Sequence, residues 1–207
     1  MTPEKNHIRV VLFDLGGVLV ELSGLPTMLA WMDNRLSAEE LSNIWLASPV
    51  VRAFETGRTT PEVFADELIE EMALPVARDE LLRELAKWPV GLFPGALELL
   101  GRVPRRYVKA TLSNSNALYW PRVMKDMQLE KAFDYHFVSF LTGKIKPDAE
   151  AFQHVMHALC CPAGEILFLD DNQLNVESAR RVGMKAFQAK GVAEAERILA
   201  EFDVLDS

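Results

Sequence analysis

The stretch IRVVLFDLGGVLV, residues 8–20, decides the fold class of this chain. Its first part, IRVVLFD, is a short apolar run that is rich in β-branched side chains and ends in the carboxylate of Asp14. Such a run predicts a strand that is buried on both faces, as the strands of a parallel sheet are. Gly16 and Gly17 then break the pattern, so a loop is expected at the carboxyl end of this strand.

Beyond residue 92, strand-like and helix-like segments alternate along the chain. Further strands are expected over residues 107–112, 135–140, 166–169 and 185–188, and helices over residues 96–100, 121–128, 147–159, 172–182 and 193–202. The alternation predicts an α/β fold with a doubly wound parallel sheet. Such sheets bind ligands at the carboxyl ends of their strands, which is where functional side chains are to be sought.

Residues 22–92 follow a different pattern, which is helical and contains no convincing strand. Residues 37–40 (SAEE) have the pattern of a capping box, and residues 60–61 (TP) place a cap residue before a proline at the first helical position. We therefore expect a core formed by residues 1–21 and 93–207, with the helical segment inserted between its first strand and the rest.

Composition and charge limit the possible partners. The 207 residues are 49% hydrophobic and 25% charged, as is usual for a soluble globular protein. Lys and Arg number 22 against 30 Asp and Glu, so the formal net charge is -8. An acidic chain has no overall attraction for nucleic acid or for anionic membrane surfaces, whereas metal cations suit its charge. We therefore expect no nucleic acid and no membrane among its partners.

The compartment follows from features that are missing. The start of the chain carries no signal-peptide core, and no apolar stretch is long enough to span a bilayer. Cys160 and Cys161 are the two cysteines; as sequence neighbours they rarely form a structural bridge, and they make no C-x-x-C pair. These features predict a reduced cytoplasmic protein, and its oligomeric state is left at monomer or homodimer.

Polar residues follow three of the predicted strands: Asp14, the pair Ser113 and Asn114, and the pair Asp170 and Asp171. Each has an ordinary role open to it, since carboxylates cap helices and Ser and Asn favour turns. Each also has a chemical role. A carboxylate can act as a nucleophile or bind Mg²⁺, and a hydroxyl and an amide beside exposed N–H groups can cradle a phosphate.

Lys146 belongs to the same predicted edge of the sheet, between a strand and a helix, while Lys144 is assigned to the surface. Asp14, Asp170 and Asp171 carry three negative charges, and a phosphate monoester adds roughly two more at pH 7. Mg²⁺ together with Lys146 supplies three positive charges. The substrate is therefore expected to bind only when the metal is present.

Four segments in order, FDLGGVL, SNSN, KPD and FLDDN, resemble the signature loops of the haloacid dehalogenase-like superfamily. The resemblance runs from about residue 8 to residue 187 and includes a helical insertion after the first loop. It is strongest to the small sugar-phosphate phosphatases that carry FDLG in place of FDLD, such as glucose-1-phosphate phosphatase. It implies a Rossmann-like core with an α-helical cap formed by residues 22–92.

The resemblance further implies a Mg²⁺-dependent phosphatase that acts on small phosphorylated metabolites through an aspartyl phosphate. Asp14 matches the nucleophile, and Lys146 matches the lysine that neutralises charge on the nucleophile and the phosphate. Ser113 and Asn114 match the loop that hydrogen-bonds the phosphoryl oxygens.

The resemblance implies a metal site as well. Asp171 matches a Mg²⁺ ligand, and Asp14 and the backbone carbonyl of Gly16 would complete the protein's share of the coordination. Asp170 matches either a further ligand or the partner of Lys146.

Position 16 marks a departure, because the phosphatase pattern has there an aspartate that protonates the leaving group, and Gly16 has no side chain. Losing a general acid typically costs about 10²–10⁴-fold in rate. We therefore expect substrates with a less basic leaving oxygen to be favoured, such as sugar 1-phosphates over primary 6-phosphates. Glu55 and Arg58, in the FETGR turn of the insertion, could replace the acid, but turn or helix-surface roles are expected for both.

Three other functions stay open. A response-regulator receiver domain also uses a phosphorylated aspartate, but its acidic pair comes first in the chain, whereas here Asp170 and Asp171 come last. A 2-haloacid dehalogenase needs no metal, and the acidic pair argues against it. A catalytically impaired binding protein is favoured by Gly16 and opposed by the intact Asp14 and Lys146.

Overall fold

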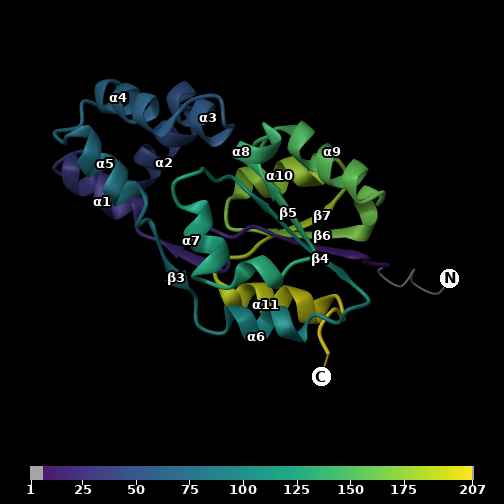
Figure 1. The fold of residues 1–207 in the computed structure, drawn as a ribbon. Helices are drawn as coiled ribbons and strands as arrows, with labels where there is room; N and C mark the ends of the chain where they lie inside the picture. Colours follow the sequence, from purple (N-terminus) through teal and green to yellow (C-terminus); the bar gives the residue numbers. More distant parts are fainter. Residues whose placement is uncertain (1–6, 207) are drawn as a thin grey trace.

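A computed structural model describes residues 7–206, and its centre is a five-stranded parallel sheet (Figure 1). The strand order is β5 (Tyr135–Val138), β4 (Val108–Ser113), β1 (Val10–Phe13), β6 (Ile166–Asp170) and β7 (Lys185–Gln188). β1 is the middle strand, and both of its neighbours come from distant parts of the sequence. The predicted α/β fold with a doubly wound parallel sheet is therefore confirmed.

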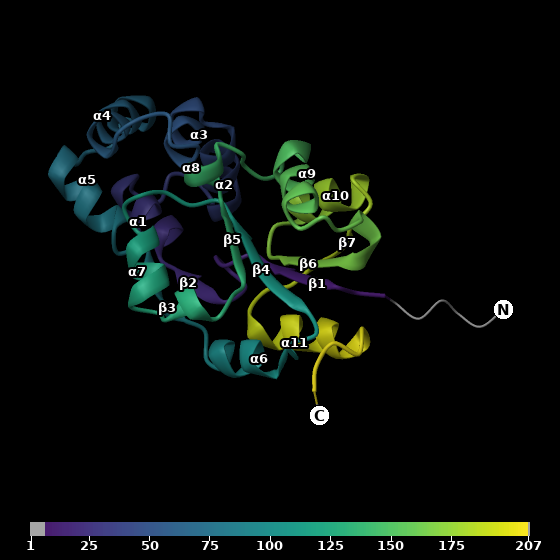
Figure 2. The same ribbon diagram turned by 45° about the vertical axis from the view of Figure 1, so that its right-hand side comes forward.

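Helices cover both faces of this sheet, as Figures 1 and 2 show. The core helices are α6 (Ala96–Arg102), α7 (Trp120–Lys125), α8 (Ser139–Thr142), α9 (Ala149–Ala158), α10 (Gln173–Arg181) and α11 (Val192–Glu201), with 3₁₀ turns at Leu129–Lys131 and Ala163–Glu165. Val11 and Phe13 pack on the side of α6 and α11, whereas Val10 and Leu12 pack on the side of α9 and α10. Successive strand residues face opposite sides, so β1 is apolar at every position.

The helices between β2 and β3 pack on one another, set to one side of the sheet in Figure 1. They are α1 (Gly24–Trp31), α2 (Ala38–Ala47), α3 (Pro49–Glu55), α4 (Pro61–Met72) and α5 (Arg78–Leu85). Phe54 and Phe64 stack in their shared cluster with ring centroids 4.1 Å apart. Both predicted helix starts are confirmed, because Ser37 forms a capping box on α2 and Thr60 caps α4.

Two short strands connect the core to these helices. β2 (Val20–Leu22) and β3 (Pro89–Leu92) pair antiparallel in a sheet of their own. The expectation that residues 22–92 contain no strand is therefore wrong at both ends of that segment, since β2 ends at Leu22 and β3 covers its last four residues. Pro89 and Gly91 both disfavour strands, so β3 is formed by its pairing with β2 rather than by its own propensity.

The predicted helix over residues 147–159 begins later than expected. Pro147 is not its first residue, since α9 starts at Ala149. The side chain of Asn114 explains the difference. It accepts a 2.9 Å hydrogen bond from the Lys146 N–H and donates a 2.9 Å hydrogen bond to the Lys146 carbonyl, which keeps this residue in a loop.

The strand predicted over residues 135–140 is likewise shorter, because it ends at Val138 and α8 follows. The Ser139 hydroxyl accepts a hydrogen bond from the Ser115 N–H at 2.9 Å and donates one to the Ser115 carbonyl at 3.1 Å, which ties the start of α8 to the loop after β4. Within residues 7–206, no helix has the length and apolar character needed to cross a bilayer.

Candidate active site

The carboxyl ends of β1 and β6 bring a lysine between two carboxylates. Lys146 Nζ lies 2.9 Å from Asp14 Oδ1 and 2.6 Å from Asp170 Oδ2. The register of the sheet allows this, because Phe13 of β1 pairs with Leu169 of β6 and each carboxylate is the next residue along its chain. All three charged side chains are buried, so the ion pairs are held away from water.

Asp170 is completely buried and its oxygens are occupied within the protein. Its Oδ1 accepts a 2.8 Å hydrogen bond from the Asn172 N–H, and Asn175 Nδ2 lies 3.0 and 3.1 Å from its two oxygens. Together with the contact to Lys146, these bonds favour Asp170 as the partner of the lysine. Direct metal binding by Asp170 stays a prediction.

Asn172 and Asn175 are site residues that the sequence did not single out. Asn172 caps α10 by accepting a hydrogen bond from the Leu174 N–H at 2.9 Å, so the cap of this helix is not one of the two preceding aspartates. Asn175 lines the cavity described below and orients Asp170. The position of Asn175 in the first turn of the helix after the acidic pair is the sequence feature that could have identified it as a site residue.

Asp171 packs directly against the backbone of the first loop. Gly17 has a φ of +73°, and a Cβ at this position would lie 2.2 Å from Asp171 Oδ2. Only glycine combines this backbone conformation with so close an approach. One oxygen from each of Asp14, Asp170 and Asp171 lies within 4.8 Å of the others, so the predicted acidic residues do meet at one point.

This acidic cluster fits a hard divalent cation. Burial raises the pKa of Asp14, and the neighbouring Asp170 and Asp171 raise it further against the opposing effect of Lys146. Burial and Asp170 raise the pKa of Asp171 in the same way. Burial alone would lower the pKa of Lys146, but the two carboxylates beside it outweigh burial and raise it. One permanent positive charge thus faces three carboxylates, and Mg²⁺, which prefers carboxylate and water oxygens, would supply the missing charge.

The predicted phosphate-binding pair is only partly placed. Asn114 lines the cavity, but its amide is engaged with the backbone of Lys146. Ser113 is buried, its hydroxyl donates a 3.4 Å hydrogen bond to the Asn114 carbonyl, and it is not among the cavity-lining residues. The structure therefore shows a positioning contact for Asn114, while phosphate binding by either residue stays a prediction.

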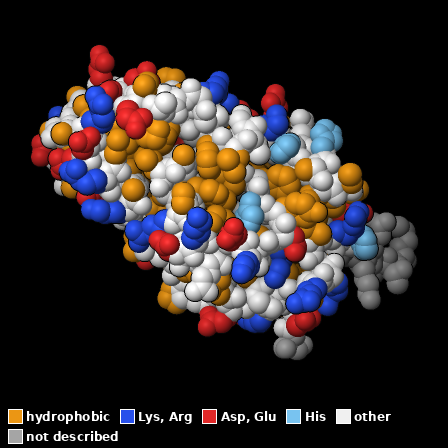
Figure 3. Space-filling model, in the orientation of Figure 1, with side chains coloured by type: hydrophobic (Ala, Val, Ile, Leu, Met, Phe, Trp, Pro, Cys, Tyr) orange, Lys and Arg blue, Asp and Glu red, His pale blue; other side chains and the backbone are white. Residues whose placement is uncertain are grey.

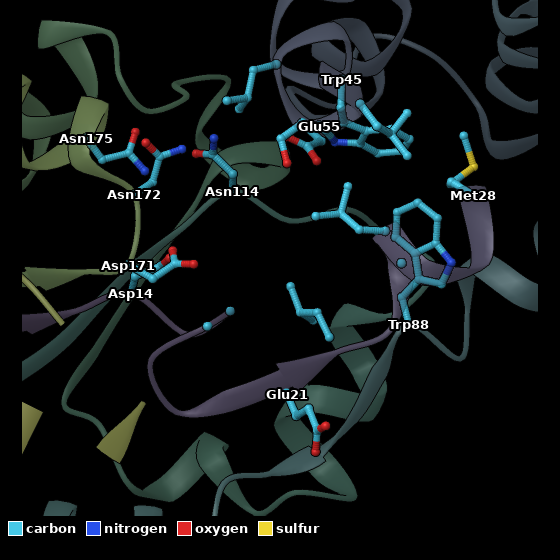
Figure 4. A pocket seen from close by; sticks show the side chains of 18 of the residues that line it. Asp14, Glu21, Met28, Trp45, Glu55, Trp88, Asn114, Asp171, Asn172 and Asn175 are labelled. Carbon is cyan, nitrogen blue, oxygen red and sulfur yellow. The ribbon is translucent and has the colours of Figure 1, made fainter. Parts of the chain in front are cut away.

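A cavity of about 520 Å³ lies between this cluster and the helices of residues 24–85. Figure 4 shows Asp14 and Asp171 on one side of it and Trp45, Trp88 and Met28 on the other. Gly16 also lines the cavity beside the carboxylates. A small molecule can thus contact both the charged end and the helices at once.

Glu55, the last residue of α3, lines the same cavity and is only 8% exposed. The turn or helix-surface role expected for it is therefore wrong. Burial raises the pKa of Glu55 to about 7, although a hydrogen bond from Trp45 and the charge of Lys146 pull it down. Arg58 does have the expected turn role, because it is exposed and its Nε donates a 2.9 Å hydrogen bond to Thr56 Oγ1.

The position of Glu55 is fixed by close packing of the next turn on the core. Gly57 has a φ of +70°, and a Cβ there would lie 2.4 Å from the carbonyl oxygen of Phe140 in α8. Arg52 of α3 also pairs with Asp148, which directly precedes α9. These contacts involve residues far apart in the sequence, so local patterns did not reveal them.

The family model of haloacid dehalogenase-like hydrolases matches residues 8–183, and the chain belongs to this family. A sesquiterpene phosphatase of Aspergillus oryzae is 28% identical over 183 residues, which are 85% of this chain and 87% of the relative. A haloacid dehalogenase-family enzyme of Bacteroides thetaiotaomicron, solved as a magnesium complex, has a TM-score of 0.71 at 25% identity and covers 89% of this chain and 94% of its own. An L-2-haloacid dehalogenase has a TM-score of 0.62 at 24% identity, with 88% of this chain and 85% of that chain covered.

The superfamily predicted from the four sequence segments is therefore confirmed, and the protein is a hydrolase. Several of the relatives that it resembles are named as phosphatases. The magnesium complex and the acidic cluster support Mg²⁺ as the cofactor. The finer resemblance to glucose-1-phosphate phosphatase stays a prediction.

Proposed function

We propose that this protein is a Mg²⁺-dependent phosphatase that hydrolyses phosphate monoesters of small metabolites through an aspartyl-phosphate intermediate. The observation that carries the proposal is the buried Lys146, whose Nζ bridges Asp14 and Asp170 at the acidic end of a cavity. The volume of about 520 Å³ lies within the range of small-molecule sites.

Asp14 is the nucleophile of the proposed reaction. Its Oδ1 accepts a 2.7 Å hydrogen bond from the Leu15 N–H and contacts Lys146, so the carboxylate is held in a fixed orientation. Lys146 keeps its proton, because both carboxylates raise its pKa, and it offsets the charge of an incoming phosphate. Asn114 holds the backbone of Lys146, and we propose that Ser113 and Asn114 face the phosphoryl oxygens.

Asp14, Asp171 and the backbone carbonyl of Gly16 would hold Mg²⁺. The ion, when bound, offsets the charge of the carboxylates and the phosphate and orients the phosphoryl group. Asp170 lies behind these residues and keeps Lys146 in place.

Two alternatives share parts of this site. A 2-haloacid dehalogenase has the same fold and would also use Asp14. It needs no metal, however, and so has no need of Asp171, which packs against Gly17 and completes the acidic cluster. A catalytically impaired binding protein would have lost part of the site, whereas here the nucleophile, the lysine and the acidic cluster are brought together.

We also propose that residues 22–92 form a cap over a core of residues 1–21 and 93–207, of which residues 1–6 and 207 lie outside the described structure. The separate hydrophobic cluster of these helices and the β2–β3 connection support this division. The proposed partner is a small phosphorylated metabolite. We further propose a cytoplasmic monomer or homodimer that binds neither nucleic acid nor membranes. Charges of both signs are interspersed on the face in Figure 3, so this face offers no surface of one sign for such partners.

The test is an assay of the purified chain with p-nitrophenyl phosphate over a Mg²⁺ titration and in excess chelator. Turnover should depend on Mg²⁺ and stop in chelator. Full activity in chelator would overturn the proposal. Release of halide from 2-chloropropionate without Mg²⁺ would establish the dehalogenase instead, and Mg²⁺-dependent binding of phosphate esters without turnover would indicate the impaired binding protein.

A further inference from the structure

The side of the cavity away from the carboxylates is apolar. Met28, Leu41, Trp45 and Trp88 line it, as Figure 4 shows for three of them. Met28 and Leu41 are 1% and 0% exposed, so they form part of a packed wall. A ligand that reaches this side therefore meets hydrocarbon and aromatic rings.

Three further leucines line the cavity while remaining in contact with solvent. Leu22, Leu25 and Leu46 are 49%, 38% and 44% exposed. Apolar surface that stays wet is unfavourable, and an apolar ligand in the cavity would remove it from water. These leucines are continuous with the cavity that holds Asp14 and Lys146, so their occupant also reaches the phosphate end.

Polar side chains are few on this side. Glu21 is exposed, and Figure 4 shows its carboxylate turned away from the cavity. The other polar side chains that the insertion and the loop after β4 contribute to the lining are Ser42, Glu55, Asn114 and Tyr119, together with the indole N–H groups of Trp45 and Trp88. A sugar carries several hydroxyls that lose water on binding, and each needs a partner to avoid a penalty. Apolar side chains outnumber the polar partners on this side of the cavity, so the lining suits a hydrocarbon body better than a sugar.

Given the proposed phosphatase function, we infer that the substrate is the phosphate monoester of an apolar alcohol. Its phosphate lies at Asp14 and Lys146, and its hydrocarbon body lies against Trp45, Trp88 and Leu46. This inference differs from the sugar phosphates expected from the sequence, because it rests on the side chains that the tertiary structure brings to the cavity.

A series of primary alkyl phosphates tests the inference, from butyl through hexyl to decyl phosphate, with glucose 6-phosphate as the polar member. The leaving group of every ester in the series is a primary alcohol, so differences in kcat/KM report contacts of the organic group. The expected kcat/KM rises by about fourfold per methylene until the cavity is filled. Hexyl phosphate should exceed glucose 6-phosphate by at least tenfold.

Two matched variants on α2 locate the effect. Leu46→Ser removes a cavity-lining leucine and should flatten the dependence on chain length. Ile44→Ser is the control, because Ile44 is 42% exposed on the same helix and does not line the cavity. A flat series in an active, Mg²⁺-dependent wild-type enzyme, or equal effects of the two variants, would overturn the apolar substrate while leaving the phosphatase intact. Absence of turnover with every ester would overturn both.

A second inference rests on a different observation, the carboxyl group of Glu55 on the cavity wall. We propose that Glu55, again within the proposed phosphatase, protonates the leaving oxygen and then takes a proton from the attacking water. Gly16 has no side chain to do this, and among the described lining residues the other titratable groups are committed or unsuited. Asp14 and Asp171 belong to the nucleophile and the metal site, and Glu21 is turned away.

The remaining two groups lining the cavity hold their protons too tightly. Asp14 and Asp170 raise the pKa of Lys146. Burial raises the pKa of Tyr119, with Glu55 adding to the effect. Neither group can give up a proton and recover it from water near neutral pH. Glu55 can do both, since burial raises its pKa to about 7 against the hydrogen bond of Trp45 and the charge of Lys146, which lower it.

The proposed steps balance. The Asp14 carboxylate oxygen forms a bond to phosphorus, the bond from phosphorus to the alcohol oxygen breaks, and that oxygen takes the proton of Glu55. Water then attacks phosphorus and gives a proton to the Glu55 carboxylate, and the bond from phosphorus to Asp14 breaks. Ester and water become alcohol and phosphate, and both carboxyl groups return to their first state.

The Glu55→Gln variant tests this role through its dependence on the leaving group. Its kcat/KM for hexyl phosphate should fall by about 10²–10⁴-fold, because an alkoxide needs a proton to leave. With p-nitrophenyl phosphate, whose leaving group needs none, the loss in kcat/KM should be below about threefold, because kcat/KM reports the steps up to release of the leaving group and not the later attack of water. Glu21→Gln is the control and should leave both substrates unchanged. Equal losses with the two substrates, or no loss with hexyl phosphate, would overturn the proposal while p-nitrophenyl phosphate still reports the phosphatase.

Discussion

The two ends of the cavity differ in their chemistry. The core end is formed by the loops after β1 and β6 together with Lys146, and the cap end by the helices of residues 24–85. At the core end, Lys146 and the three aspartates concentrate charge, and ion pairs and hydrogen bonds hold Lys146 and Asp170 in place. At the cap end, Trp45 and the leucines present apolar surface with Glu55 as a single buried acid. From this difference we propose that the core end holds the nucleophile and the phosphate, whereas the cap end selects the organic group and supplies the acid that protonates the leaving oxygen.

The largest effect is expected from a substitution at the core end, at the proposed nucleophile. Asp14→Asn removes the nucleophile but keeps the shape of the side chain, so kcat should fall by more than about 10⁴-fold. Steady-state assays with p-nitrophenyl phosphate measure the loss, and circular dichroism checks the fold. Appreciable turnover in a folded Asp14→Asn protein would contradict covalent catalysis through this residue.

A smaller effect concerns the buried acid of the cap end. The pKa of Glu55 is about 7 in the folded protein against a usual 4.5, so the folded state binds this proton more tightly than the unfolded state. Glu55 therefore costs no stability below about pH 4.5 and destabilises as the pH rises through about 7, by up to about 3 kcal/mol. Relative to the wild type, Glu55→Gln should raise the melting temperature more at pH 8 than at pH 5.

The comparison of the two proteins isolates Glu55, because Asp14 and Asp171 also titrate but are present in both. Thermal unfolding at the two pH values is the measurement. An equal difference in melting temperature at pH 5 and pH 8 would mean that the carboxyl of Glu55 is not strained by burial.

Adding a single methyl group at Gly17 is expected to weaken Mg²⁺ binding at the proposed metal site. Gly17→Ala would place a Cβ 2.2 Å from Asp171 Oδ2 and force this carboxylate to move. The half-saturating Mg²⁺ concentration should rise by about tenfold or more, as it does when groups that orient metal ligands are changed. Gly164→Ala is the control, since no atom lies within 4 Å of its added Cβ. Unchanged Mg²⁺ dependence in Gly17→Ala would place the metal away from Asp171.

The smallest effect concerns the missing acid of the first loop. A Cβ at Gly16 would meet only the end of the half-exposed Leu22 side chain, at 2.7 Å, so Gly16→Asp can be accommodated. The added carboxyl group should narrow the ratio of kcat/KM for glucose 1-phosphate over glucose 6-phosphate by a few-fold, because it helps the poorer leaving group more. An unchanged ratio in an active variant would assign selectivity to the cap end alone.

Much of the core end was predictable from the sequence. The apolar run of β1 has no alternation because both faces are buried, and this pattern is visible in one dimension. Parallel strands in a doubly wound sheet end at one edge, so Asp14, Asp170 and Asp171 were expected to meet before any distance was known. The capped starts of α2 and α4 were predictable for the same reason, since a cap depends on residues a few positions apart.

Other local features, at both ends of the cavity, were decided by the tertiary structure. Pro89–Leu92 becomes a strand because β2 pairs with it, against the preference of its own proline and glycine. Pro147 stays outside α9 because Asn114, far away in sequence, holds the backbone of Lys146. In both places a contact between distant segments outweighs the local propensity.

Glu55 shows most clearly why part of the site could not be predicted from the sequence. In the sequence it is an acidic residue before a turn, a position that solvent usually covers. In the fold, α3 docks on the core through Gly57 and α8, and burial then turns an ordinary carboxyl group into one with a pKa of about 7 at the wall of the cavity. Residue types and their order determined where the charges of the core would gather, whereas desolvation depends on which distant segments cover a side chain, and only the packed structure decides that.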